Sequence, residues 1–134
     1  MNASESVGKL VLRLTLGVLL LFHGVHKMAS GIGFIENMLA MHGLPGWFAY
    51  AVYLGEVLAP ILIILGVVTR VGAGLVIINM IVAVLLVGTD RLFMVGRTGG
   101  YALELEAFYL FGAVAIFFLG AGSLSVGGRQ GRWN

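Results

Sequence analysis

Apolar residues dominate four long stretches of this chain, and the shorter segments between them carry most of its charges. The stretches cover about residues 8–26, 47–68, 71–88 and 102–119, and Asn79 is the only strongly polar residue of the third. A helix needs about 20 mostly apolar residues to cross the hydrocarbon core of a bilayer, and each stretch comes close to that length. The pattern therefore predicts an all-α membrane protein made of one domain, a bundle of four transmembrane helices.

The connections between the stretches differ in length. Thr69 and Arg70 alone separate the second and third stretches, so these two helices must form a tight antiparallel hairpin. The connection between the first and second is longer, and its apolar residues recur at helical spacing: Phe34, Ile35, Met38, Leu39 and Met41. This pattern is typical of a short amphipathic helix that lies in the plane of the membrane interface.

Lysine and arginine residues near the ends of the stretches predict the orientation, because cytoplasmic ends carry more of them. Four crossings place both termini on one side, together with Lys9, Arg13, Arg70, Arg129 and Arg132. The other side has Lys27, Arg91 and Arg97. This imbalance predicts that both termini are cytoplasmic.

The first stretch has a competing interpretation as a secretory signal peptide, since Lys9 precedes an apolar run. However, Arg13 interrupts that run, and no small-x-small cleavage site follows it. An uncleaved membrane helix is therefore the favoured interpretation.

Composition narrows the class of protein further. Apolar residues make up 60% of the chain and charged residues 10%, against roughly 45–50% and about 25% in soluble domains. A net charge of +2 with no basic stripe is too small to indicate nucleic-acid binding, so no nucleic-acid partner is expected. The chain has no cysteine, which excludes disulfides, thiolate metal ligands and cysteine-based redox relays.

Ionisable residues inside the apolar stretches are the candidate functional residues, because a charge in the membrane costs several kcal/mol and is usually buried in the bundle. In the predicted topology six of them share the outer half of the membrane: His23, His26, Lys27, Glu56, Glu104 and Glu106. Glu104 and Glu106 are about 200° apart around a helix, and we expect Glu106 to face the bundle. Arg13, at the opposite end, is interpreted as an anchor that reaches the inner headgroups, with a pairing role as the alternative.

Glu56 carries the strongest signal of this set. It lies roughly 12–14 Å below the start of its helix at Trp47, which is too deep for a short side chain to reach water. Glu56 therefore needs a proton or a partner, either His23 or the pair His26 and Lys27. Pro60 adds to this polarity, since a proline in a helix frees the carbonyl four residues earlier, here that of Glu56. Two interpretations stay open: a structural pair that holds two helices together, and a polar pocket that binds a small ligand or relays protons.

Small residues predict where the helices approach one another closely. They are Ala51, Gly55 and Ala59 in the second stretch, Gly72 and Gly74 in the third, Gly17 and Gly24 in the first, and Gly112 in the fourth.

No catalytic or cofactor motif is complete, so the sequence leaves open whether the protein is an enzyme. His23 and His26 can share a metal, with Glu56 or Glu106 as a third ligand, but without thiols we expect no metal site. His42 lies in a connection and not on a facing helix, so haem is not expected either, nor any covalently bound cofactor.

Several short motifs follow one another along the chain: Arg13, Gly17, Gly24 and Lys27, then Gly55-Glu56, Gly66 and Thr69-Arg70, and finally Glu106 and the exit Gly120–Ser125. In this order and spacing they resemble the DoxX family of small four-helix bacterial membrane proteins. The resemblance implies a multi-pass bundle in the bacterial cytoplasmic membrane. It implies function more loosely: the family is named for a subunit of a thiosulfate:quinone oxidoreductase, and other members resemble membrane partners of redox or metal-stress proteins.

Two hypotheses about function follow. The first is a redox-associated membrane component that binds a quinone or similar lipophilic ligand and works with an electron-donating partner protein. Its candidate ligand-binding residues are His23, His26, Lys27, Tyr53, Glu56, Glu106 and Tyr109. The second is a non-enzymatic subunit or scaffold whose buried charges are structural. A third alternative, conduction of a small solute or ion, would need a homo-oligomer, because four short helices enclose little volume.

Overall fold

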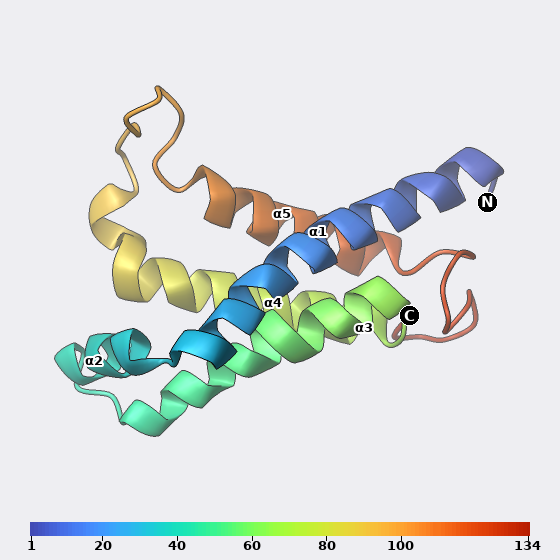
Figure 1. The fold of residues 1–134 in the computed structure, drawn as a ribbon. Coiled ribbons are helices and arrows are strands. Elements are labelled where there is room, and N and C mark those ends of the chain that lie inside the picture. The colour runs from blue at the N-terminus through green and yellow to red at the C-terminus, as the bar shows by residue number, and fades with distance from the viewer.

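The computed structural model describes residues 1–134 and shows an all-helical chain with no β-strand. Figure 1 shows helices packed side by side, with both termini at the same end. The elements are α1 (Ala3–Ser30), α2 (Gly33–Met41), the 3₁₀ helix η1 (Gly46–Ala51), the π turn η2 (Leu54–Leu58), α3 (Ala59–Leu65), α4 (Thr69–Ala83), the π turn η3 (Val84–Gly88), the 3₁₀ turn η4 (Thr89–Arg91) and α5 (Glu104–Leu119). The all-helical prediction is confirmed.

Three helical stretches are long and apolar enough to cross a membrane, namely Ala3–Ser30, Gly46–Leu65 and Thr69–Arg91. They correspond to the first three predicted spans. The fourth predicted span is the helix α5, which packs against α4 and α1. Its 16 residues rise about 24 Å, short of the roughly 30 Å of a bilayer core. A crossing by α5 therefore stays a prediction.

The predicted short helix between the first two spans is confirmed as α2, which ends at Met41 before a left-handed Gly43. Its buried residue Leu39 packs with Ile32 and with Ala49 of η1. The chain in this region thus folds back as a separate small layer at the end of the bundle opposite the termini (Figure 1).

The predicted hairpin between the second and third spans is also confirmed. Gly66 ends α3 in the left-handed conformation, with φ of 71°, and Val68 precedes α4 with φ of 40°. The side chain of Asn134 accepts hydrogen bonds from the backbone and hydroxyl of Thr69, and so caps the first turn of α4.

The main core lies where α1, α3, α4 and α5 meet. Its buried residues are Leu16, Leu20, Ala59, Ile63, Ala73, Val76, Met80, Tyr109, Ala113 and Ile116. Gly17 and Gly72 sit directly against backbone carbonyls of α3, those of Pro60 and Ala59, as close helix approach requires. The expected packing role of Gly74 is wrong, because nothing lies within 4 Å of the position its Cβ would take.

The interpretation of Arg13 as an anchor that reaches the inner headgroups is wrong, because Arg13 is buried inside the bundle. Its side chain is only 1% exposed and donates four hydrogen bonds to backbone carbonyls. Nε bonds Ile63 at 2.9 Å and Nη2 bonds Ile64 at 3.1 Å, while Nη1 bonds Ala121 at 2.5 Å and Leu124 at 3.0 Å. The last carbonyls of a helix have no partner within it and form the negative end of its dipole. Arg13 thus satisfies the end of α3 and ties it to the segment after α5.

Candidate functional site

Glu56 lies in the π turn η2, where the second of the three stretches that could cross a membrane departs from regular α-helix. The backbone N–H of Ala59 donates to the carbonyl of Leu54, five residues earlier, and Pro60 follows directly. π turns inside helices are frequent at functional sites. The Glu56 side chain is buried, with 4% of the residue exposed.

Two side chains from other helices hold the Glu56 carboxylate. The Lys27 ammonium of α1 lies 2.5 Å from Oε2, and the Asn79 amide of α4 donates to Oε1 at 3.1 Å. Lys27–Glu56 is the only ion pair in the structure. A buried carboxylate is costly unless it is paired and hydrogen-bonded, and here both oxygens have a donor. The predicted need for a partner is confirmed, and of the alternatives named the partner is Lys27.

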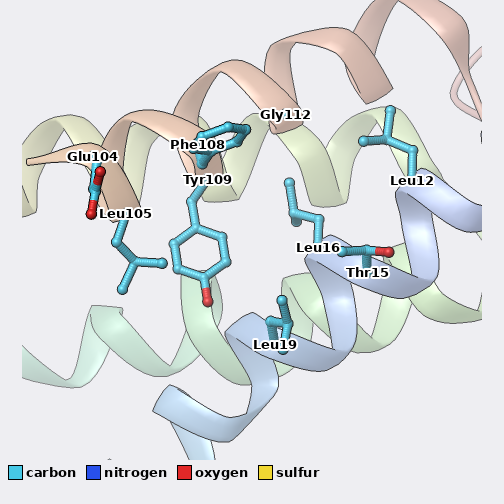
Figure 2. Close-up of a pocket in the computed structure, with 9 residues that line it drawn as sticks. All are labelled: Leu12, Thr15, Leu16, Leu19, Glu104, Leu105, Phe108, Tyr109 and Gly112. Carbon is cyan, nitrogen blue, oxygen red and sulfur yellow. The ribbon is translucent and has the colours of Figure 1, made fainter. Parts of the chain in front are cut away.

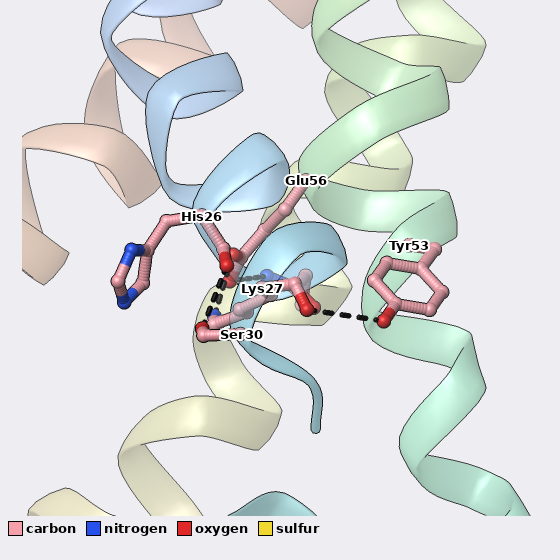
Figure 3. A network of polar contacts seen from close by, with 6 residues as sticks. His26, Lys27, Ser30, Tyr53 and Glu56 are labelled. Carbon is pink, nitrogen blue, oxygen red and sulfur yellow. Dashed lines mark hydrogen bonds and ion pairs between the residues drawn. The ribbon is translucent and has the colours of Figure 1, made fainter.

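Two glycines allow this close approach. A Cβ on Gly24 would collide with the backbone carbonyl of Glu56, and a Cβ on Gly55 would collide with the side chain of Asn79. One further contact fixes the end of α1, because the Tyr53 hydroxyl donates to the Lys27 carbonyl at 3.3 Å (Figure 3). The local backbone is therefore shaped to bring three helical segments together at one carboxylate.

A cavity of about 460 Å³ opens beside this carboxylate. Lys27, Glu56 and Asn79 form its polar wall. The remaining wall is mostly apolar and includes Phe34, Met38 and Leu39 of α2, Phe48 of η1, Ile78 and Val82 of α4, and Leu86 of η3. Ligand sites commonly have this size and this combination of an apolar lining with a few convergent polar groups.

The histidines of the predicted cluster do not reach this cavity. His23 packs edge-on against Tyr109 of α5, with ring centroids 5.8 Å apart. The His26 imidazole is exposed and points away from Glu56 in Figure 3. His23 shares a face of α1 with Lys27, but only the longer lysine side chain extends to η2.

The acidic residues of α5 are also separate from Glu56. Glu106 is half-buried and Glu104 is exposed. This difference agrees with the expectation that Glu106, and not Glu104, faces the bundle. Glu106 makes no hydrogen bond or ion pair and lines neither large cavity, whereas Glu104 and Tyr109 line a second groove. The residues predicted as one cluster thus divide between two sides of α1, and no three of the histidine and acidic side chains converge.

Asn79 is the site residue that sequence reasoning missed. The available signal was its position as the only strongly polar residue of an apolar stretch. A neutral amide attracts less notice than a charge, yet in hydrocarbon it too needs a partner.

Comparisons with known proteins agree with the motifs in the sequence. The family model described as DoxX matches residues 8–89, more than half of the chain, and this range includes Arg13, Lys27, Glu56 and Asn79. The protein named "Putative oxidoreductase CatD" from Bacillus subtilis (strain 168) is 30% identical over 110 residues, which cover 82% of this chain and 81% of that protein. No solved structure matches the chain.

Proposed function

Because this chain belongs to the DoxX family of membrane proteins, we propose that it is a redox-associated membrane component that binds a quinone or a similar lipophilic ligand beside Glu56. The observation that carries the proposal is a buried carboxylate, held by Lys27 and Asn79, in the wall of an otherwise apolar cavity. The oxidoreductase name of the Bacillus subtilis relative supports the redox part.

The chemistry of the cavity suits a quinone. The ring and isoprenoid tail of such a ligand are apolar and fit among Phe34, Met38 and Phe48. The Lys27 ammonium and the Asn79 amide are donors for a ring carbonyl, and the Glu56 carboxylate is an acceptor for the hydroxyl of the reduced form. A histidine is not needed for this arrangement, since Glu56 itself can accept and return a proton.

The cavity also faces the region that lipid would occupy. Leu54, Ile78 and Val82 line it, and these side chains are 49%, 61% and 44% exposed in the isolated chain. A ligand dissolved in the hydrocarbon can therefore enter sideways, without crossing the aqueous surface. A bound quinone supplies an acceptor for two electrons and two protons, and the electrons come from a separate redox partner protein.

The proposed setting is the bacterial cytoplasmic membrane, with α5 as a fourth crossing and both termini in the cytoplasm. In this orientation Lys27, Glu56 and the cavity lie in the outer half of the membrane. An electron-donating partner would then approach the outer surface formed by α2, η1 and the loop before α5.

Ligand binding is tested with purified protein and a short-chain ubiquinone analogue, by measuring the dissociation constant. Glu56→Gln and Asn79→Leu each remove one polar contact of the cavity, and we expect each to weaken binding about tenfold. Glu106→Gln is the matched control, because it makes the same change outside the cavity, and its affinity should equal that of the wild type. Unchanged affinity in both Glu56→Gln and Asn79→Leu would refute the assignment.

A structural scaffold is the second candidate, favoured by the fact that Lys27 and Asn79 already satisfy both oxygens of Glu56. If the cluster only joins helices, Glu56→Gln lowers the thermal unfolding temperature, and the wild type shows no saturable binding of the analogue. The two measurements together separate a clamp from a ligand site.

A further inference from the structure

A second groove, of about 390 Å³, lies between α1 and α5 and shares no residue with the cavity beside Glu56. Its lining residues are Leu12, Thr15, Leu16, Leu19, Glu104, Leu105, Phe108, Tyr109 and Gly112 (Figure 2). A Cβ on Gly112 would lie 2.8 Å from the side chain of Leu16, so this glycine lets α1 and α5 approach each other closely at the floor of the groove. The groove is apolar except at three positions, Thr15, Glu104 and Tyr109.

Tyr109 is a largely buried residue whose hydroxyl has no partner within the protein. The residue is 7% exposed, and its hydroxyl oxygen stays accessible and makes no hydrogen bond to the protein. Figure 2 shows the ring extending from α5 toward α1, with the hydroxyl at its free end. A buried tyrosine hydroxyl usually finds an acceptor. Neither of the other polar residues of the groove, Thr15 and Glu104, accepts a hydrogen bond from it, so an acceptor for this accessible hydroxyl would come from a ligand.

Glu104 places a negative charge at one end of the same groove. It is the first residue of α5, it is exposed, and no lysine, arginine or histidine pairs with it. Tyr109 follows five positions later in α5, a rise of about 7.5 Å along the helix. From the outer end inward, the groove thus presents an anion, then a hydroxyl donor, then the leucines of α1.

This order matches a phospholipid that carries a positive charge at its headgroup. We propose that the α1–α5 groove binds a phospholipid with a primary-amine headgroup, its ammonium on Glu104, an ester carbonyl on the Tyr109 hydroxyl and an acyl chain along Leu12, Leu16 and Leu19. The lining contains no lysine or arginine, so a lipid with net negative charge meets only repulsion from Glu104. This site is independent of the proposed quinone cavity.

The proposal is tested by native mass spectrometry of the delipidated protein, titrated with phosphatidylethanolamine or phosphatidylglycerol of identical acyl chains. We expect the wild type to retain phosphatidylethanolamine about fivefold better, the upper range for an exposed ion pair. Glu104→Gln should abolish this preference, whereas Glu106→Gln, two residues away and outside the groove, should keep it. Tyr109→Phe should weaken retention of both lipids about fivefold, because both have the ester carbonyl.

Three results would overturn the proposal. The first two are equal retention of the two lipids by the wild type and a preference that persists in Glu104→Gln. Because Glu104 is exposed and unpaired, its substitution leaves the fold intact, so a loss of preference reports on the headgroup contact. Retention that is unchanged in Tyr109→Phe would show that the groove holds only an acyl chain and would also count against the assignment.

Discussion

Two buried charged residues, Glu56 and Arg13, are stabilised by different kinds of partner. Glu56 has an opposite charge and an amide, whereas Arg13 has four backbone carbonyls and no carboxylate. The first arrangement faces a cavity. The second is enclosed, and it joins the end of α3 to the segment after α5, so its role is structural.

Substitution of Arg13 tests this structural role. Arg13→Lys keeps the charge but cannot reach four carbonyls at once, because an ammonium is a single point donor. We expect a loss of about 2–3 kcal/mol in the free energy of unfolding, the cost of leaving buried carbonyls unpaired. Arg97→Lys, at an exposed position whose side chain makes no ion pair, is the control and should be neutral. Equal stability of the two variants would contradict the structural role of Arg13.

At this scale the sequence correctly predicted that Glu56 has a partner, because a carboxylate that deep in an apolar helix must find one. It did not distinguish Lys27 from the histidines, since that choice depends on the length of each side chain and on the contact of His23 with Tyr109. Arg13 was misjudged because its partners are backbone atoms, which leave no mark in a sequence.

At the scale of elements, the packing of α1 on η2 depends on one missing side chain. Gly24→Ala would push α1 away from the Glu56 carbonyl and pull Lys27 from its carboxylate. We expect a loss of about 2–3 kcal/mol in the free energy of unfolding, together with weaker ligand binding. Gly74→Ala, in the open part of α4, should instead gain about 0.5–1 kcal/mol from helix propensity. Thermal unfolding of both variants checks the contrast, and a neutral Gly24→Ala would contradict it.

Helix positions could be predicted from the sequence, because apolar stretches and helical spacing are strong signals, and α2 is an example. The π turns η2 and η3 could not, since one extra residue in a turn changes neither composition nor period detectably. The division into two grooves also escaped prediction. It depends on which elements pack on each side of α1. The sequence predicts how deep each residue lies in the membrane, but not which side of α1 it faces.

At the scale of the whole molecule, we expect α5 to cross the membrane as a fourth span. The chain has no cysteine, so single cysteines can be introduced cleanly at Ala3, Phe93 and Arg132. Phe93 is 99% exposed, in the loop before α5. We expect an impermeant maleimide added to spheroplasts to label Phe93→Cys only, with Ala3→Cys and Arg132→Cys labelled after lysis. Labelling of Arg132→Cys from outside would show that α5 does not cross.

The arrangement of the molecule assigns different roles to its two ends. The end with both termini is closed by hydrogen bonds, from Arg13 to the carbonyl of Ile63 and from Thr69 to the side chain of Asn134. The opposite end holds the cavity beside Glu56, lined by residues of α2 and η1, and the end of the α1–α5 groove at Glu104. Ligand chemistry is therefore expected at that end.

The central claim, a quinone site beside Glu56, is tested most directly by photo-crosslinking. A quinone analogue with a photoreactive tail is bound to the protein in vesicles, irradiated, and the modified peptides are identified by mass spectrometry. We expect crosslinks within residues 34–56 and 75–87. Unlabelled quinone should compete with this crosslinking, and Glu56→Gln should reduce its yield. Modification confined to residues 12–19 and 104–112, or labelling that unlabelled quinone does not compete, would contradict it.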